Sequence, residues 1–224
     1  MDDANWALIE TERATLADLL ATLSADQWEA SSLCSEWRVR DVAAHLAMTP
    51  AGAPTIRTML RALAHNRGHL WSAGRDVAIA HAARSTDQLV AELRRDAACR
   101  TKPIFVSADN ILLDLLVHGQ DIAVPLGIAR HVAPSAGQIS LHRLWDMGWP
   151  FHARRRFDGV TLQAVDCGWS AGQGPVASGT AAAILLLLTG RTAALDQLHG
   201  SGVELVRHRV TPPRLQQHPI DQRR

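Results

Sequence analysis

Apolar residues in the first two thirds of the chain recur at intervals of three and four, the period of an amphipathic helix. The clearest case is the segment from Asn5 to Leu23, where one helical face carries Trp6, Ile9, Leu16, Leu19, Leu20 and Leu23. The same periodicity, with capping serines and terminating prolines or glycines, predicts further helices over 39–48, 54–65, 85–99, 108–124 and 134–149. Several helices joined by short connections predict a bundle.

The pattern changes after Phe157. Residues 160–165 are rich in β-branched and apolar types and predict a strand, and the glycine-rich stretch from 168 to 179 predicts a hairpin or an irregular strand pair. Thr180 is placed to cap a short apolar helix that Gly190 ends, and we expect a helix over 191–198 and a strand over 203–210. The chain is therefore predicted to be α+β overall. We expect a helical bundle over 1–153, a small α+β domain over 154–210 and a flexible tail over 211–224.

Composition excludes several classes of protein. The 224 residues carry 23 basic and 22 acidic side chains, a net charge of +1, whereas a nucleic-acid-binding domain is usually clearly basic. The longest apolar run, Ala181 to Leu188, is much shorter than the roughly 18 residues of a membrane span. We therefore expect neither a nucleic-acid partner nor a membrane segment.

The expected location is the cytoplasm. The chain starts Met1-Asp2-Asp3 and shows no secretory signal, and its three cysteines, Cys34, Cys99 and Cys167, are widely spaced, as free thiols of a reducing compartment would be. A monomer and a homodimer are both compatible with the sequence.

Candidate chemistry is concentrated on two predicted helices. Asp114, His118 and Asp121 are spaced by four and three residues, so they share one face of a strongly apolar helix, and His45 lies on another apolar helix. Two imidazoles and one carboxylate from facing helices would form a metal site with an open position, as in catalytic zinc sites. Spacing alone equally allows an ordinary carboxylate–histidine pair and a buried histidine that donates to a backbone carbonyl.

The motifs around these residues resemble a known family. Cys34-Ser-Glu-Trp37-Arg-Val-Arg-Asp-Val-Ala-Ala-His45, Asp114-Leu-Leu-Val-His118-Gly-Gln-Asp121 and, near the end, Thr189-Gly190-Arg191 are similar to segments of the actinobacterial mycothiol-dependent maleylpyruvate isomerase-like family. The resemblance runs from Trp6 to Val210. It implies a DinB-like four-helix bundle followed by a sterol-carrier-like α+β domain.

The resemblance also implies a site. His45, Asp114 and His118 match the family's metal-binding histidine, acidic residue and second histidine, although well-studied members have glutamate where this chain has Asp114. Asp121 competes for the carboxylate role, and we favour for it the role of an acceptor that orients His118. Ser35 and Glu36 stand where the family usually has Pro-Gly.

Other polar residues have two interpretations each. Arg191 is either an anchor for a substrate carboxylate or a cation stabilised by a helix C-terminus. Cys34 could be a nucleophile, but Leu33 and Trp37 beside it favour a buried packing role. His65 and His69 are interpreted as an exposed helix end, and the tryptophans, Trp37, Trp71, Trp145, Trp149 and Trp169, as core more than pocket.

The resulting functional hypothesis is a metal-dependent enzyme that uses mycothiol as its thiol cosubstrate. Zinc is the expected metal, and the partners are a low-molecular-weight thiol and a small electrophile, on which the enzyme would act as an isomerase or a thiol S-transferase. Two alternatives stay open: a module that binds a hydrophobic ligand through the sterol-carrier-like domain, and a DinB-like metalloprotein that acts without mycothiol.

Overall fold

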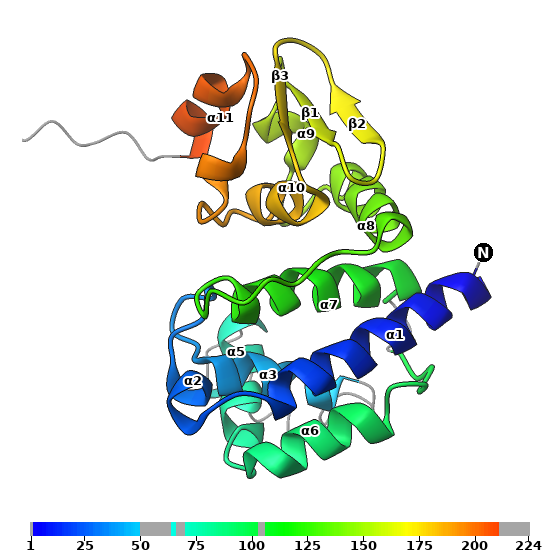
Figure 1. Cartoon of the computed structure of the whole chain (residues 1–224), viewed down its shortest axis with the longest axis vertical. Helices are drawn as coiled ribbons and strands as arrows, with labels where there is room; N and C mark the ends of the chain where they lie inside the picture. The colour runs from blue at the N-terminus through cyan, green and yellow to red at the C-terminus, as the bar shows by residue number, and fades with distance from the viewer. Residues whose placement is uncertain (1, 50–63, 66–69, 103–105, 211–224) are drawn as a thin grey trace, which may run out of the picture.

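The computed structural model describes residues 2–49, 64–65, 70–102 and 106–210. Figure 1 shows a helical part, which contains the N-terminus, and beside it a smaller part in which a short sheet is covered by helices. The α+β class predicted from the sequence is confirmed.

Four helices form the bundle: α1 (Asp2–Ala21), α3 (Val39–Met48), α6 (Thr86–Arg95) and α7 (Ala108–Ala123). Each packs on two others, so that α1 and α3 both contact α6 and α7. Two more helices belong to this part, namely α2 (Ala25–Glu29) and α5 (Leu70–His81), and both pack on α3. The apolar faces of the bundle are buried against one another, as the periodicity predicted.

Serine side chains cap several helices, as predicted for those that begin near residues 85 and 108. Ser24 and Ser85 form reciprocal capping boxes with Gln27 and Gln88, and Ser107 accepts a hydrogen bond from the Asn110 backbone N–H at the start of α7. Two helices are shorter than predicted. Helix α6 ends at Arg95 and not at residue 99, and α8 (Pro134–Asp146) ends before the predicted residue 149. Helix α5 was not predicted, and Gly74 within it weakens the helical signal.

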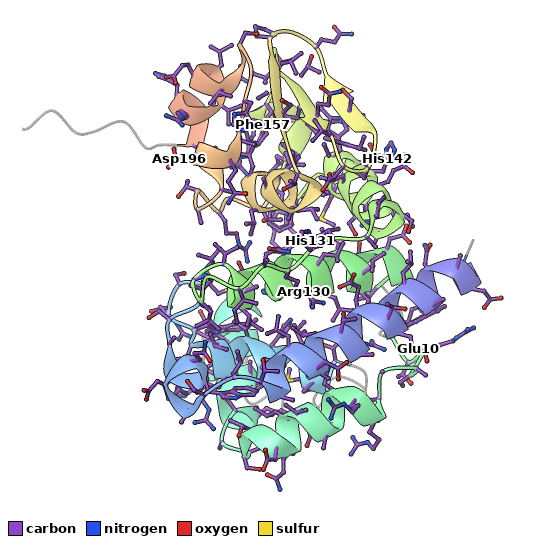
Figure 2. The ribbon with its side chains drawn as sticks, viewed as in Figure 1. Glu10, Arg130, His131, His142, Phe157 and Asp196 are labelled. Carbon is purple, nitrogen blue, oxygen red and sulfur yellow. The ribbon has the colours of Figure 1, made fainter. Side chains whose placement is uncertain are left out.

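Two buried charged residues of α1 interrupt the simple amphipathic pattern. Glu12 pairs with Arg130 at 2.7 Å, and Arg13 donates to the backbone carbonyls of Ala97 and Cys99 beyond the end of α6. Figure 2 shows Arg130 on the segment that runs alongside α7. The Glu12–Arg130 pair thus balances two charges that would otherwise be costly to bury, whereas the backbone carbonyls bond only to Nη1 of the Arg13 guanidinium.

The second part is built on a three-stranded sheet with the order β2-β1-β3. Strand β1 (Thr161–Ala164) pairs antiparallel with β2 (Trp169–Gly172) and parallel with β3 (Val176–Gly179). The stretch from 168 to 179 therefore supplies two strands, but they lie on either side of β1 and do not pair with each other. The helix α10 (Ala181–Leu188) packs on β1 and β3 and also on α7 and α8.

Two predictions for the second part were wrong. Residues 203–210, predicted as a strand, form the helix α11 (Val203–Val210): Val203, Val206 and Val210 follow helical spacing, and Val206 is fully buried. Residues 191–198 hold only the 3-10 turn η1 (Leu195–Gln197), and a four-residue helix, α9 (Ala153–Arg156), precedes β1.

Helix α8 joins the two parts. It contacts α7 on one side and α10 on the other, and its residues His142 and Trp145 meet Trp169 of β2 edge to face. The division at 153/154 stays a prediction, since α8 packs on both parts. Of the helix predicted over 54–65, only residues 64 and 65 are described, and both are helical and exposed. The rest of that prediction lies outside the described residues, as do His69 and the tail over 211–224.

None of the described helices combines the length and the apolar character that crossing a membrane requires.

Candidate metal centre

Helices α3 and α7 bring the predicted ligands together. His45 Nε2 is 3.2 Å from Asp114 Oδ2, and His118 Nε2 is 3.4 Å from Asp114 Oδ1, so each carboxylate oxygen faces one imidazole. The two rings lie edge to face with centroids 5.0 Å apart. The donor atoms of the three residues lie within 4.8 Å of one another.

These separations fit a divalent metal ion. Donors held about 2.1 Å from zinc at tetrahedral angles lie about 3.4 Å from one another, close to the two distances measured here. Burial alone would raise the pKa of the Asp114 carboxyl, but the charges of His45 and His118 and their hydrogen bonds hold that pKa well below its usual range. The site therefore combines an ionised carboxylate with two imidazoles, the donor set that zinc prefers.

Asp121 lies behind His118 on the same helix and is fully buried. Its Oδ2 is 2.9 Å from His118 Nδ1, so Nδ1 can donate its proton to Asp121 while Nε2 faces Asp114. Burial opposes the charged imidazolium, yet Asp114 and Asp121 outweigh it and raise the pKa of His118 above its usual value. The same negative field that favours a proton on this ring favours a cation beside it.

Arg191, from the second part of the fold, also contacts Asp121. Its Nε and Nη2 donate to Asp121 Oδ1 and Oδ2 at 3.0 and 2.7 Å, and its Nη1 donates to the Thr189 carbonyl. Burial would raise the pKa of Asp121, but the hydrogen bonds from His118 and Arg191 lower it below its usual value. The carboxylate that Arg191 meets in the structure is thus one of the chain's own, and its role toward a substrate stays a prediction.

Local backbone geometry directs Arg191 to this place. Helix α10 ends in a Schellman motif: Gly190 N–H bonds to the Leu187 carbonyl and Arg191 N–H to the Leu186 carbonyl. Gly190 has φ +91°, a conformation that side chains with a Cβ rarely adopt. The sequence predicted the helix stop at Gly190 but did not place Arg191 against α7.

The loop between α2 and α3 supplies Cys34, whose contacts differ from the packing role favoured by the sequence. The thiol is 3.0 Å from Asp121 Oδ2, 3.6 Å from His118 Nδ1 and 3.4 Å from Arg191 Nη2. A backbone hydrogen bond from Leu33 N–H to the Asp121 carbonyl attaches the loop to α7. Because each of these contacts joins residues 84 or more positions apart along the chain, spacing could not reveal them.

Cys34, His118 and Asp121 form a second set of donors with metal-like spacing, which shares His118 with the first. We favour the first set as the metal site, because Asp121 already accepts two hydrogen bonds from the Arg191 guanidinium. A cation placed among the second set would lie beside that guanidinium and be repelled by it.

A cavity of about 860 Å³ opens onto the donor set. Its wall includes His45, Asp114 and His118, together with Cys34 and Arg191. Trp37 also lines it, with its ring centroid 5.5 Å from that of His45 and 6.0 Å from that of His118. The cavity can therefore bring a small molecule into contact with the donor set.

Comparison with known proteins identifies the family. The model of the mycothiol maleylpyruvate isomerase N-terminal domain matches residues 9–123, just over half of the chain. The chain belongs to this family. The matched region contains His45, Asp114, His118 and Asp121, whereas Arg191 lies beyond it.

Solved structures extend the likeness to most of the fold. A crystal structure of the mycothiol-dependent maleylpyruvate isomerase superposes with a TM-score of 0.56 at 17% identity, over 90% of this chain and 93% of that one. A histidine-to-alanine mutant of that isomerase gives 0.53 at 16% identity, with the same coverage. At such identities the likeness shows a shared fold alone. A comparison with curated proteins gives no match.

Proposed function

We propose that this protein is a metal-dependent enzyme that uses mycothiol as a thiol cosubstrate and acts on a small electrophile. The observation that carries the proposal is the spacing of His45, Asp114 and His118 in the wall of a cavity. Membership of the maleylpyruvate isomerase family and the shared fold support the choice of thiol and reaction class. We propose zinc as the metal because two imidazoles and one carboxylate are typical ligands of catalytic zinc.

His45, Asp114 and His118 would hold the metal ion. When bound, the metal acts as a Lewis acid that lowers the pKa of a thiol, so that thiolate is present at neutral pH. Asp121 keeps the proton of His118 on Nδ1 and so leaves the lone pair of Nε2 for the metal. Trp37 packs near both imidazole rings and limits their rotation.

Arg191 acts through Asp121 in this proposal. Its two hydrogen bonds fix the carboxylate that orients His118, and its Nη2 atom is also near Cys34 in the cavity wall. Arg191 is thus a positioning residue that joins the end of α10 to the centre, and we retain for it the predicted contact with a substrate carboxylate.

The thiolate would add to one carbon of a polarised carbon–carbon double bond of the substrate, so that a carbon–sulfur bond forms while the π bond opens and its electron pair moves to the conjugated acceptor group. If rotation about the resulting single bond follows and the electron pair returns to expel the thiolate, the net reaction is a cis–trans isomerisation. If the neighbouring carbon takes up a proton and the carbon–sulfur bond persists, the protein is a thiol S-transferase.

Calorimetric titration with mycothiol tests this function. We expect saturable binding to the metal-loaded protein and its loss after treatment with EDTA, followed by recovery when zinc is restored. Binding that is unchanged by EDTA, or no binding to fully loaded protein, would overturn the proposal. Turnover of electrophiles with water or glutathione alone would instead support a DinB-like metalloprotein, and an apolar ligand co-purifying with metal-free protein would support a binding module.

A further inference from the structure

An ion pair in the cavity wall has no part in the metal centre. Glu36, in the loop between α2 and α3, accepts a hydrogen bond from Nη1 of Arg75 on α5, with Oε2 2.5 Å away. Both residues line the same cavity as His45 and His118. The Glu36 side chain is 71% exposed, whereas that of Arg75 is 33% exposed, so the guanidinium is the more enclosed partner.

The backbone at Glu36 favours a different residue. Its φ of +66° lies in the left-handed region, where glycine is the least strained choice. Among the described residues other than glycine, only Glu36 and His152 adopt a positive φ. The glutamate at this position is therefore not explained by backbone conformation, and its evident contribution is the carboxylate it brings to Arg75.

Charge is balanced throughout the described part of the cavity wall. Asp114 lies between two histidines, and Arg191 donates to Asp121. Arg75 meets Glu36 and, at 3.4 Å, the carboxylate of the adjacent Asp76. Each guanidinium described in the wall thus already meets a carboxylate of the chain, and Arg75 meets two.

We propose that Glu36 sets the charge selectivity of this cavity by neutralising Arg75. Electrophiles that carry no carboxylate near Arg75 are accepted, whereas a dicarboxylate must compete with Glu36 for the guanidinium. This inference rests on the function proposed above, because it assumes that the cavity binds an electrophilic substrate. The selectivity itself concerns binding, so it can be measured without turnover. Because the Glu36 carboxylate is largely exposed to water, its removal should change selectivity without affecting the fold.

The experiment compares two unreactive ligands of similar size, succinate and its neutral diamide, succinamide. Both are titrated by calorimetry into the full-length chain, as purified and after EDTA treatment. The variants are Glu36→Gln, Glu36→Gly and the double variant Glu36→Gln/Arg75→Gln. The matched control is Glu204→Gln on α11, which removes the same charge from a side chain that is 86% exposed and is absent from the cavity wall.

We expect both Glu36 variants to bind succinate about fivefold more tightly than the wild type, with succinamide unchanged. The gain should vanish in the double variant and be absent in Glu204→Gln. Equal succinate affinity in wild type and Glu36→Gln, an equal gain for succinamide, or a gain that persists without Arg75 would each overturn the inference. Failure of the proposed function would appear separately, as absent mycothiol binding with the succinate pattern intact.

Discussion

Asp121 Oδ2 lies 2.9 Å from His118 Nδ1, so a buried carboxylate fixes the imidazole whose other nitrogen faces Asp114. Both residues come from α7, one helical turn apart, and the Arg191 guanidinium donates to both oxygens of the same carboxylate. The arrangement of His118, Asp121 and Arg191 should therefore affect both the affinity for the metal and the stability of the protein. It also connects α7 to the end of α10 in the second part of the fold.

Asp121→Asn should weaken zinc binding by about 10- to 100-fold without abolishing it. The amide keeps the shape of the side chain but loses the charge that makes Asp121 a strong acceptor for His118 Nδ1–H and thereby makes Nε2 a stronger ligand. Competition with a chromophoric zinc chelator measures the change. Asp196→Asn, at a side chain that is 95% exposed, serves as the control and should bind zinc as the wild type does. Unaltered affinity in folded Asp121→Asn would show that His118 is oriented without Asp121.

Arg191→Met should lower the free energy of unfolding by about 3 kcal/mol, because it removes both hydrogen bonds of the guanidinium from the fully buried Asp121 carboxylate. Urea denaturation followed by tryptophan fluorescence measures the loss. The exposed pair between Arg207 and Asp196 gives the matched control, since Arg207→Met should change stability by less than about 0.5 kcal/mol. Equal losses in the two variants would contradict a structural role for Arg191 at the centre.

The stability contributed by Asp121 should depend on pH. Because the pKa of this carboxyl is lowered in the folded state, its contribution is present above its ordinary pKa of about 4 and is lost as the pH falls through the lower folded value. The difference in unfolding free energy between wild type and Asp121→Asn should therefore be larger at pH 5 to 6 than in acid, and it should shrink as the pH falls below about 4. Denaturation of metal-free protein at a series of pH values tests this, and a difference that grows in acid would contradict it.

Two glycines should respond in opposite directions to alanine. Gly190→Ala should cost about 1 kcal/mol, because φ +91° strains any residue with a Cβ, and it should also displace Arg191. Gly74→Ala, inside α5, should stabilise the protein by about 0.5–1 kcal/mol, because the added Cβ meets no described atom within 4 Å other than its chain neighbours and the backbone of its own helix. Thermal unfolding of both variants checks the signs, and a stabilising Gly190→Ala would refute the Schellman geometry.

The sequence predicted the elements that local signals specify. Helices with regular apolar spacing and capping serines, such as α1 and α7, were predicted to within a few residues. Residues 203–210 were misjudged because β-branched residues favour strands, whereas their spacing and the burial of Val206 decide for a helix. Tertiary packing thus overrode intrinsic preference at that point.

The candidate site was predictable only where its residues share a helix or a family motif. Asp114, His118 and Asp121 are neighbours on α7, and His45 was a candidate because it lies on a second apolar helix and also matches a family motif. Contacts made by loops were not predictable: Cys34 reaches Asp121 because the Leu33 backbone bonds to α7, and Arg191 does so through the end of α10. Periodic patterns in a sequence do not reveal contacts between residues that are this far apart along the chain.

Metal content measured on matched variants tests the central claim most directly. We predict about one zinc per chain, by mass spectrometry of metals after dialysis, in the wild type and in Cys34→Ser, and a loss of bound zinc in His45→Ala with circular dichroism unchanged. This outcome would assign the metal to His45, Asp114 and His118. Zinc retained by His45→Ala but lost from Cys34→Ser would assign it to the other donor set, and a metal-free wild type after growth with zinc would contradict the account.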